Sequence, residues 1–477
     1  MAAITERKFL GFPEGFLWGA ATSHFQIEGH PEELSHRLSD WSQWTATAGK
    51  IADASTADLA CQFFERFGQD MEICRDLHLN AFRISLNWPI LCPVAPEPGQ
   101  PLVLDPKGVI YYRELLASLK ADGVTTFVTL FHFTLPHWLS AKGGWNNPES
   151  ASDFANFAEQ AVTAFGDLVD FWLTLNEPLA YVYQGYVSGL WPPGYKHDYL
   201  GAFTSIRYML EGHALAYKAI HNLRPGAKVS FAMHWRPFVP KTRWNPFDCM
   251  VTYFRNYVFN RMFPQAVQLG KLSFPYPISK NGAVKALSGP ILGLKGTQDY
   301  IAVNYYTREL SCFKFKWPID LFGVASDKPE FEVNCLGWEN FPDGFYQTLV
   351  NGLKPFKYNL DGSVRPIYVT ENGFPTAFNA DMEEGDWSLA DDLRVHYLET
   401  HLHALHRAIK DGANVKGYLY WSLLDNFEWA EGLKARFGLV RITYPTQERT
   451  LRKSAHVYAD IAKKNGILSG SMVENEI

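Results

Sequence analysis

The sequence predicts an α/β fold, a single-domain (β/α)₈ barrel of the TIM type with long βα loops at the C-terminal face. Strand-like runs alternate with helical patterns along the chain, and eight such runs can be counted. Several runs are apolar almost throughout, as expected of parallel strands that are covered on both faces. The length of 477 residues exceeds that of most single domains, but it suits a barrel of this kind with insertions.

Each predicted strand is rich in β-branched or aromatic residues. In chain order the predicted strands cover residues 16–23, 81–88, 125–133, 170–178, 228–235, 300–307, 366–373 and 415–425. Apolar residues recur at helical spacing between them, for example over residues 154–165 and 398–409, and a glycine follows each of these two patterns. This alternation indicates repeated β/α units.

The predicted strands are much farther apart than the shortest β/α unit requires, so the excess is expected in loops and extra helices at the working face. Segments rich in Pro, Gly and aromatic residues are candidates for that rim: 89–106, 179–199, 236–247 and 310–340. No repeat or inter-domain linker is evident. We therefore expect one catalytic domain over residues 1–477, with a core from about 12 to 464 and a frayed tail over 468–477.

Composition excludes several classes of partner and cofactor. The net charge of −6 is spread without blocks, which argues against a nucleic-acid partner. The six cysteines show no paired C-x-x-C spacing, so neither a zinc site nor a disulfide framework is indicated. The N-terminus lacks an apolar signal-peptide core and no run is long enough to span a membrane, so we expect a cytoplasmic protein with reduced thiols. No metal or organic cofactor is implied, and a homo-oligomer remains possible.

Two glutamates at the ends of predicted strands are the main candidates for chemistry. Glu177 lies between Asn176 and Pro178 at the end of the fourth strand, and Glu371 lies in a Thr-Glu-Asn-Gly stretch at the end of the seventh. Pro178 is expected to hold Glu177 in an extended conformation. The ends of barrel strands share one mouth. Two carboxyl groups there, one protonated and one ionised, are what cleavage of a glycosidic bond requires. Taken singly, each could be a surface glutamate at a strand end.

At this point the chain resembles glycoside hydrolase family 1, the β-glucosidase and β-galactosidase family, from about residue 12 to residue 464. The matching stretches occur in the family's order: FPEGFLWGAATS, QIEG, FRIS, KGGW, NEP, NYYT, TENG, WSLLDNFEWAEG and RFGL. The resemblance implies a (β/α)₈ barrel that hydrolyses β-linked sugars with retention, with Glu177 as acid/base and Glu371 as nucleophile. Hydrolysis would then pass through a covalent glycosyl–enzyme intermediate.

The remaining site residues are carried over from the same resemblance. Arg83, Tyr306 and Asn304 are expected to tune or order the nucleophile, and an arginine or hydroxyl beside Glu371 would lower its pKa. The negative charge of Glu371 should in turn raise the pKa of Glu177. Hydrogen bonds and ring faces for the sugar are expected from Gln26, His132, Asn176, Trp421, Glu428 and Trp429. Viewed alone, Arg83 could be an ordinary ion-pair residue, His132 a structural histidine, and either tryptophan plain core packing.

Glu428 also bears on the substrate. Phospho-glycosidases of this family usually have Ser and a basic cluster in this region, whereas a carboxylate would repel a phosphate. We therefore expect terminal β-D-glucosides, with β-fucosides and β-galactosides as further substrates. One departure is Thr134, which stands where the family commonly has an aspartate. Two alternatives stay open: a catalytically inert carbohydrate-binding relative, and an enzyme that mainly transglycosylates. A thioglucosidase is disfavoured, because those resemble the family with Gln at the position of Glu177.

Overall fold

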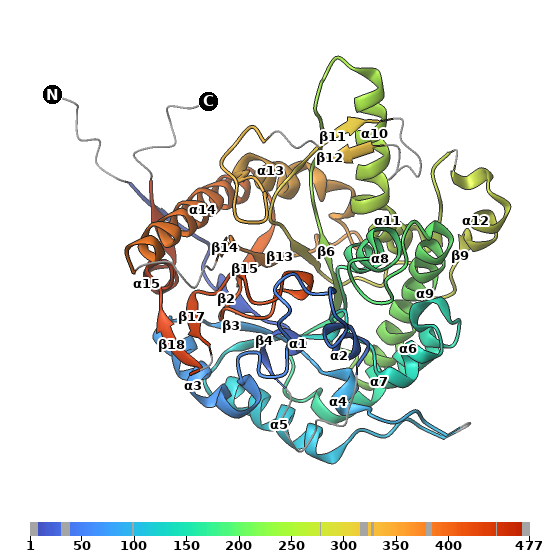
Figure 1. The fold of residues 1–477 in the computed structure, drawn as a ribbon, viewed down its shortest axis with the longest axis horizontal. Helices are drawn as coiled ribbons and strands as arrows, with labels where there is room; N and C mark the ends of the chain where they lie inside the picture. The colour runs from blue at the N-terminus through green and yellow to red at the C-terminus, as the bar shows by residue number, and fades with distance from the viewer. Residues whose placement is uncertain are drawn as a thin grey trace.

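The computed structural model describes residues 8–29, 39–97, 100–276, 278–314, 323–325, 329–377, 384–444 and 446–469. Eight parallel strands close into a barrel, with the neighbour order β2, β3, β4, β5, β6, β10, β13 and β15, where β15 returns to β2 (Figure 1). Their bounds are Leu17–Ala21, Ala81–Ser85, Thr125–Phe131, Phe171–Asn176, Lys228–His234, Ile301–Asn304, Ile367–Asn372 and Val415–Trp421. The predicted fold class is confirmed. Each strand lies inside its predicted run, and most end two or more residues earlier.

Helices surround the barrel as an outer layer (Figure 1). The principal ones, in chain order, are α3 (Phe63–Asp76), α5 (Pro106–Ala121), α7 (Ser150–Phe165), α9 (Tyr199–Leu223), α11 (Met262–Leu269), α13 (Pro342–Gln347), α14 (Glu384–Lys410) and α15 (Lys453–Lys464). The two helical patterns found in the sequence correspond to α7 and to the second half of α14. Further helices lie in the connections: α1 (His24–Ile27), α2 (Asp40–Thr45), α4 (Trp88–Leu91), α6 (His137–Ala141), α8 (Pro178–Val182), α10 (Pro246–Asn256) and α12 (Gly282–Leu287).

Barrel strands are apolar on both faces because each face packs against a different layer. On β5, Phe171 and Leu173 belong to the cluster inside the barrel, while Trp172 belongs to the core between strands and helices. The pairing of β5 with β6 then shifts register between Leu173 and Asn176. Irregularities of this kind re-aim side chains near active sites. Here Leu175 packs in the outer core and Asn176 reaches the cavity at the barrel mouth.

One glycine at the mouth is required by close packing between strands. A Cβ atom built on Gly373 would lie 1.8 Å from the carbonyl oxygen of Trp421. No side chain fits there, so Gly373 lets the chain after β13 pass directly against the end of β15. Gly373 is not among the residues with positive φ, so close packing and not a left-handed turn calls for glycine here.

The two ends of the described chain pair with each other outside the barrel. Strand β1 (Phe9–Gly11) runs antiparallel to β19 (Gly466–Leu468), and Ser469 N donates to the Lys8 carbonyl oxygen at 2.7 Å. The tail expected to fray from Leu468 is held to Ser469 by this pairing, and the core extends beyond the expected limits of 12 and 464. The rest of the expected tail, residues 470–477, lies outside the described residues.

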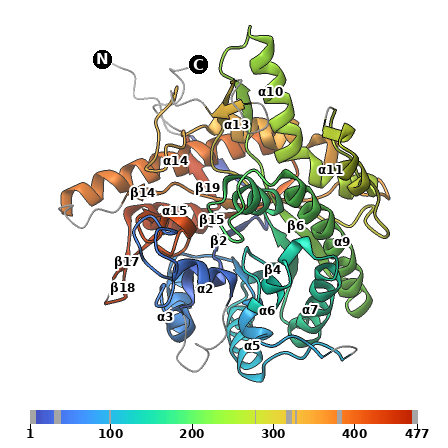
Figure 2. The ribbon, with the colours of Figure 1, turned by 45° about the vertical axis from the view of Figure 1, so that its right-hand side comes forward.

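The connections after the strands build the rim. A small sheet of β7 (Phe238–Pro240), β11 (Glu309–Phe313) and β12 (Gly323–Ala325) stands beside α10, which projects from the barrel (Figures 1 and 2). Other short strands pair locally: β8 (Lys271–Leu272) with β9 (Gly289–Pro290), β14 (Thr376–Ala377) with β16 (Ala435–Arg436), and β17 (Val440–Thr443) with β18 (Glu448–Leu451). Along the part of the chain that the structure describes, no helix is long and apolar enough to cross a membrane.

Candidate active site

Glu177 stands where β5 turns directly into α8. Its backbone is left-handed (φ 42°, ψ 56°), and Pro178 is the first residue of the helix. The extended conformation expected from Pro178 is therefore wrong. Proline disfavours the right-handed helical region for the residue before it, yet its own fixed φ suits the first position of a helix. The left-handed turn meets both conditions, while Glu177 N still donates to the Ala232 carbonyl oxygen on β6 at 2.9 Å.

Glu371 lies near the end of β13, and each of its carboxylate oxygens has a donor. Arg83 Nη1 donates to Oε1 at 2.6 Å and the Tyr306 hydroxyl donates to Oε2 at 2.5 Å. Arg83 lies in the middle of β3, and its fully buried side chain reaches Glu371 through the barrel interior. These donors leave the carboxylate little freedom to rotate.

Asparagines 176 and 304 connect the two glutamates. Asn304 Nδ2 donates to Glu177 Oε1 at 2.7 Å and to Asn176 Oδ1 at 3.1 Å. Arg83 Nη2 donates to the same Asn176 oxygen at 2.7 Å, while its other amino group binds Glu371. One network of charge-assisted and neutral hydrogen bonds therefore runs from one carboxyl group to the other.

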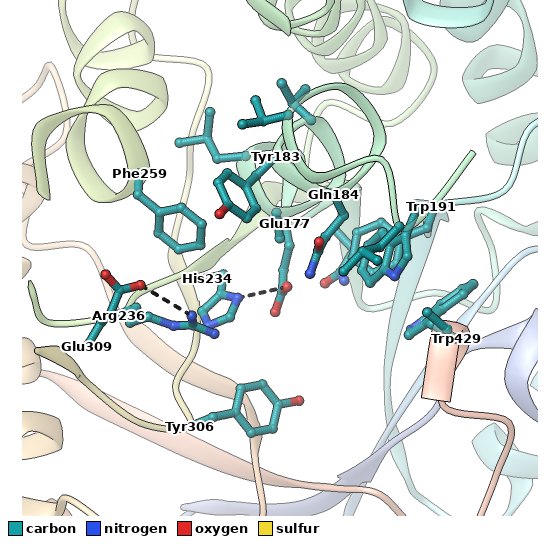
Figure 3. Close-up of a pocket in the computed structure, with 18 of the residues that line it drawn as sticks. Glu177, Tyr183, Gln184, Trp191, His234, Arg236, Phe259, Tyr306, Glu309 and Trp429 are labelled. Carbon is teal, nitrogen blue, oxygen red and sulfur yellow. Dashed lines mark hydrogen bonds and ion pairs between the residues drawn. The ribbon is translucent and has the colours of Figure 1, made fainter. Parts of the chain in front are cut away.

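His234, at the end of β6, is a site residue that the sequence analysis missed. Its Nδ1 lies 3.1 Å from Glu177 Oε2, and Figure 3 shows the ring beside that carboxyl group. His234 Nε2 is buried without a hydrogen-bond partner among the described residues. The signal was available, because His234 is the next-to-last residue of a predicted strand and therefore belongs at the mouth. It carried no motif that would single it out.

The carboxyl groups of Glu177 and Glu371 titrate as a pair. Burial raises the pKa of Glu371 to about 7; the Arg83 guanidinium opposes this rise and the Glu177 charge adds to it. Burial also acts to raise the pKa of Glu177, but a charged His234, the hydrogen bonds to His234 and Asn304, and Arg83 together bring that pKa below its ordinary value. This order is the reverse of the one expected from the sequence. Two causes produce it: burial of Glu371, which outweighs the effects of Arg83 and Tyr306, and the contact of Glu177 with His234.

His132 presents an unused nitrogen to the cavity. Asn176 Nδ2 donates to His132 Nε2 at 3.0 Å, which leaves the ring proton on Nδ1. That nitrogen is buried and has no partner among the described residues. Burial and the nearby Arg83 hold the pKa of His132 well below its usual value, so the ring is neutral. A buried N–H at the cavity wall is suited to bind an oxygen of a ligand.

Glu428 lies at the same wall and is supported from behind by Gln26. Gln26 Nε2 donates to Glu428 Oε2 at 3.1 Å, and Gln26 Oε1 has no partner within the described part of the chain. Burial raises the pKa of Glu428 to about 8, and the charge of Glu371 adds to the rise. Close to neutral pH, Glu428 can therefore both donate and accept a hydrogen bond.

The indole rings of Trp421 and Trp429 face the cavity as well as the core. The His132 ring lies 6.1 Å from each of them, centroid to centroid, at interplanar angles of 27° and 23°. Behind the cavity, Trp429 packs on Phe25 and Trp41 at 5.9 and 4.7 Å. Trp421 and Trp429 therefore belong both to the core and to the cavity wall, because one part of each ring is packed and another part borders the cavity.

A single cavity of about 530 Å³ joins these groups. Three of the four predicted rim segments contribute to its lining; among the described residues, segment 89–106 does not. Lining residues that the sequence analysis did not single out include Tyr183, Trp191, Arg236, Glu309, Trp338 and Phe437, several of which are labelled in Figure 3. Gln26, Arg83 and Asn304 are absent from the lining and contact it through Glu428, Glu371 and Glu177.

The departure at Thr134 is compensated locally. The Thr134 hydroxyl lies 2.6 Å from Nε2 of buried His24, whose Nδ1 is 2.7 Å from the Ser85 hydroxyl. Burial lowers the pKa of His24 to about 3, so this ring is neutral and needs no carboxylate partner. Within the described residues, no group of three or more His, Cys, Asp or Glu side chains is placed to hold a metal ion.

A closed parallel barrel with two buried glutamates on one cavity is an arrangement of barrel enzymes that act through paired carboxyl groups. The model of glycosyl hydrolase family 1 matches residues 10–467. Beta-glucosidase A of Thermotoga maritima is 32% identical over 461 residues, covering 96% of this chain and 98% of that protein. A 1,4-beta-D-glucan glucohydrolase of Thermotoga neapolitana is also 32% identical, over 96% and 99% of the two chains.

Solved structures agree with these relatives. The structure of the family 1 β-glucosidase from Thermotoga maritima in complex with isofagomine lactam superposes with a TM-score of 0.85. It is 30% identical, over 96% of this chain and all of that chain. The chain therefore belongs to glycosyl hydrolase family 1.

Proposed function

We propose that this protein is a retaining β-glycosidase that removes terminal β-D-glucosyl residues, with Glu371 as nucleophile and Glu177 as acid/base. The observation that carries the proposal is the unequal setting of two carboxyl groups on one cavity. Glu371 is held by a permanent cation and a hydroxyl, whereas Glu177 is held by the neutral amide of Asn304 and the imidazole of His234. We further propose that the whole chain acts as one catalytic domain, since strands from both halves are needed to close the barrel.

In the first step Glu371 attacks the anomeric carbon as Glu177 gives its proton to the departing oxygen, which yields a glycosyl ester on Glu371. Arg83 and Tyr306 hold the attacking carboxylate in one orientation. Esterification removes the negative charge of Glu371. Glu177, now ionised, takes a proton from water, and the water oxygen attacks the same carbon to release the sugar.

Glu177 and Glu371 share one proton in the reactive form of the enzyme, and this proton must be on Glu177. Arg83 is charged at every relevant pH and always favours an ionised Glu371. His234 favours an ionised Glu177 only while it is protonated. A charge on His234 is the largest influence that lowers the pKa of Glu177.

Recognition of the sugar is assigned to groups with unused hydrogen-bonding capacity. We propose that His132 Nδ1, the Asn176 amide and Glu428 bind sugar hydroxyls, with Asn176 at the 2-hydroxyl, and that Gln26 contributes through its free Oε1. Trp421 and Trp429 supply apolar faces for the ring. Glu371 and Glu431 add negative charge around Glu428, which supports an unphosphorylated sugar. β-Glucosides, and also β-fucosides and β-galactosides, are the proposed substrates.

The stereochemistry of the first product tests the mechanism. Proton NMR of early hydrolysis of an aryl β-glucoside should show the β-anomer of glucose before mutarotation; an initial α-anomer would contradict retention. Release of glucose would exclude a binding-only relative. If added alcohol diverts nearly all product into a new glycoside, the main activity is transglycosylation.

Glu371→Gln tests the nucleophile. We expect turnover to fall roughly 10³-fold or more, with an unchanged circular dichroism spectrum and melting temperature. Near-normal activity would remove Glu371 from this role. Glu431→Gln, at an exposed lining residue, is the matched control and should stay within a few-fold of the wild-type protein.

A further inference from the structure

The cavity continues past the catalytic groups into a chamber that none of the assigned sugar-binding residues explains. Its walls come from α8, the π-helical turn η3 (Tyr183–Ser188), α9 and the turn η4 (Tyr257–Arg261). Figure 3 shows Tyr183 and Phe259 beside Glu177, on the side away from Tyr306. The leaving group must depart past Glu177, because that residue protonates it. The chamber is therefore on the leaving-group side.

The chamber wall is apolar. No Asp, Glu, Lys or Arg of α8, η3, α9 or η4 is among the described residues that line the cavity. The amide oxygen of Gln184 already accepts a hydrogen bond from the Ser188 hydroxyl at 2.6 Å. The body of the chamber is lined by aliphatic side chains that include Leu179, Val182, Val187, Ala202, Ile206 and Val258.

The polar side chains on the wall itself are those of Tyr183, Gln184 and Tyr199. The other polar groups on this side lie at its inner edge: His234, Arg236 and the ion pair between Arg255 Nη2 and Glu309 Oε1 at 2.9 Å. Figure 3 shows Arg236 beside His234, close to Glu309. A second sugar unit would bring hydroxyl groups against the aliphatic wall. A hydroxyl left without a partner there would weaken binding, whereas each buried methylene would strengthen it.

We propose that this chamber binds an apolar aglycone, so that the preferred substrates are β-glycosides of long-chain alkyl or bulky aryl alcohols and not oligosaccharides. The inference rests on the proposed glycosidase function and names the substrate class of the same site. The alkyl or aryl group bound in the chamber is attached to the oxygen that Glu177 protonates. The length of this group does not affect the site that binds the glycone.

The test compares methyl β-glucoside, octyl β-glucoside and cellobiose as substrates. We expect kcat/KM to be about 100-fold higher for octyl than for methyl β-glucoside, since burying about three of the seven added methylene groups, at roughly fourfold each, gives a factor of this order. Cellobiose should stay below octyl β-glucoside. Ala202→Phe adds bulk to the chamber wall and should reduce the octyl preference at least tenfold while methyl β-glucoside changes little. Leu215→Phe, at an exposed site on the same helix, should leave both unchanged.

Binding without turnover separates this proposal from the proposed function. Octyl β-thioglucoside should bind the wild-type protein at least tenfold more tightly than methyl β-thioglucoside in calorimetry, with a more negative heat-capacity change. If no β-glycoside is hydrolysed but this preference is present, the catalytic proposal fails and the chamber assignment stands. Hydrolysis with cellobiose preferred, or equal binding of the two thioglucosides, would overturn the apolar aglycone.

Discussion

Each catalytic candidate has a different set of neighbours, and these neighbours decide what it can do. Glu371 is held by a guanidinium and a phenol in the fully buried interior of the barrel, whereas Glu177 is held by an amide and an imidazole at the turn into α8. Two glutamates with the same intrinsic chemistry can therefore take opposite roles. The consequences can be measured one residue at a time.

Removal of the Glu177 carboxyl group should slow the hydrolysis of glucosides with poor leaving groups more than that of glucosides with good leaving groups. For Glu177→Ala we expect kcat/KM to fall about 10²–10⁴-fold for alkyl glucosides, which need a proton on the departing oxygen. Dinitrophenyl β-glucoside, whose leaving group needs no proton, should lose much less in the step that forms the glycosyl ester. The measurement is a series of aryl glucosides with leaving groups of graded pKa. Equal losses across the series would argue against general acid catalysis by Glu177.

The contact between His234 and Glu177 should affect how activity depends on pH. Protonated His234 favours an ionised Glu177 and moves the shared proton to Glu371, the inactive arrangement. His234→Asn keeps a hydrogen-bond donor but can never be charged, so the acid limb of the profile of kcat/KM against pH should shift to lower pH. His234→Lys, with a cation at most pH values, should depress kcat/KM across the range. An acid limb that stays in place in His234→Asn would show that His234 does not govern the shared proton.

At the scale of elements, buried ion pairs attach the last helix to the end of the barrel. Asp425, just after β15, accepts two hydrogen bonds of 2.8 Å from Arg452, the residue that caps α15, and Arg436 lies 3.6 Å away. Burial works against ionisation of Asp425, but Arg452 and Arg436 hold its pKa below the ordinary value. The side chains of Arg452 and Arg436 are only 8% and 4% exposed, so their charges would be left buried if the Asp425 carboxylate were lost.

Asp425→Asn should therefore destabilise the protein by about 3–5 kcal/mol, the usual cost of breaking a buried pair. Urea unfolding monitored by fluorescence measures this difference. The folded pKa is lowered, so the stabilisation is present above the unfolded pKa of about 3.9 and is lost as pH falls through the folded pKa. The difference in unfolding free energy between Asp425→Asn and the wild-type protein should accordingly become smaller in acid.

The control for this element is the exposed pair between Arg113 and Asp167, whose side chains are 44% and 47% exposed. Asp167→Asn should cost less than about 1 kcal/mol, because exposed pairs are screened by water and salt. A cost for Asp425→Asn as small as that of the control would show that α15 is held by its apolar contacts alone.

At the scale of the whole molecule, the barrel is closed by strand pairing and not by the chain termini. Strand β15 pairs with β2 over five residues, while the ends meet separately in the pairing of β1 with β19. Lys8 N donates to the Ser469 hydroxyl at 2.8 Å. A short linker can therefore join residue 469 to residue 8 without moving either.

A circular permutant joined in this way and opened between Asp361 and Gly362, in an exposed turn, should fold and keep its activity. We expect a melting temperature within about 5 °C of the parent, since only one surface turn is cut. A second permutant opened between Leu173 and Thr174, inside buried β5, should not fold. Failure of the first permutant with correct linker length would show that the order of strand synthesis matters to barrel closure.

The sequence by itself determined the eight strands, the order in which they occur and the two glutamates that end the fourth and seventh. Strands that are buried on both faces are apolar almost throughout their length. The C-terminal ends of the strands of a parallel barrel all lie at the same face of the barrel. The sequence did not reveal His234, the left-handed turn at Glu177 or the order of the two pKa values.

Only the tertiary structure decided those features, because they depend on contacts between residues that are distant in the chain. An imidazole 57 positions from Glu177 changes the acidity of that carboxyl group through a single 3.1 Å contact. The apolar chamber likewise arises where α8, η3, α9 and η4 enclose a space that the sequence of no one of them specifies. Periodicity reports which face of an element is buried, but the electrostatics and the shape of a site come from the partners that the fold brings together.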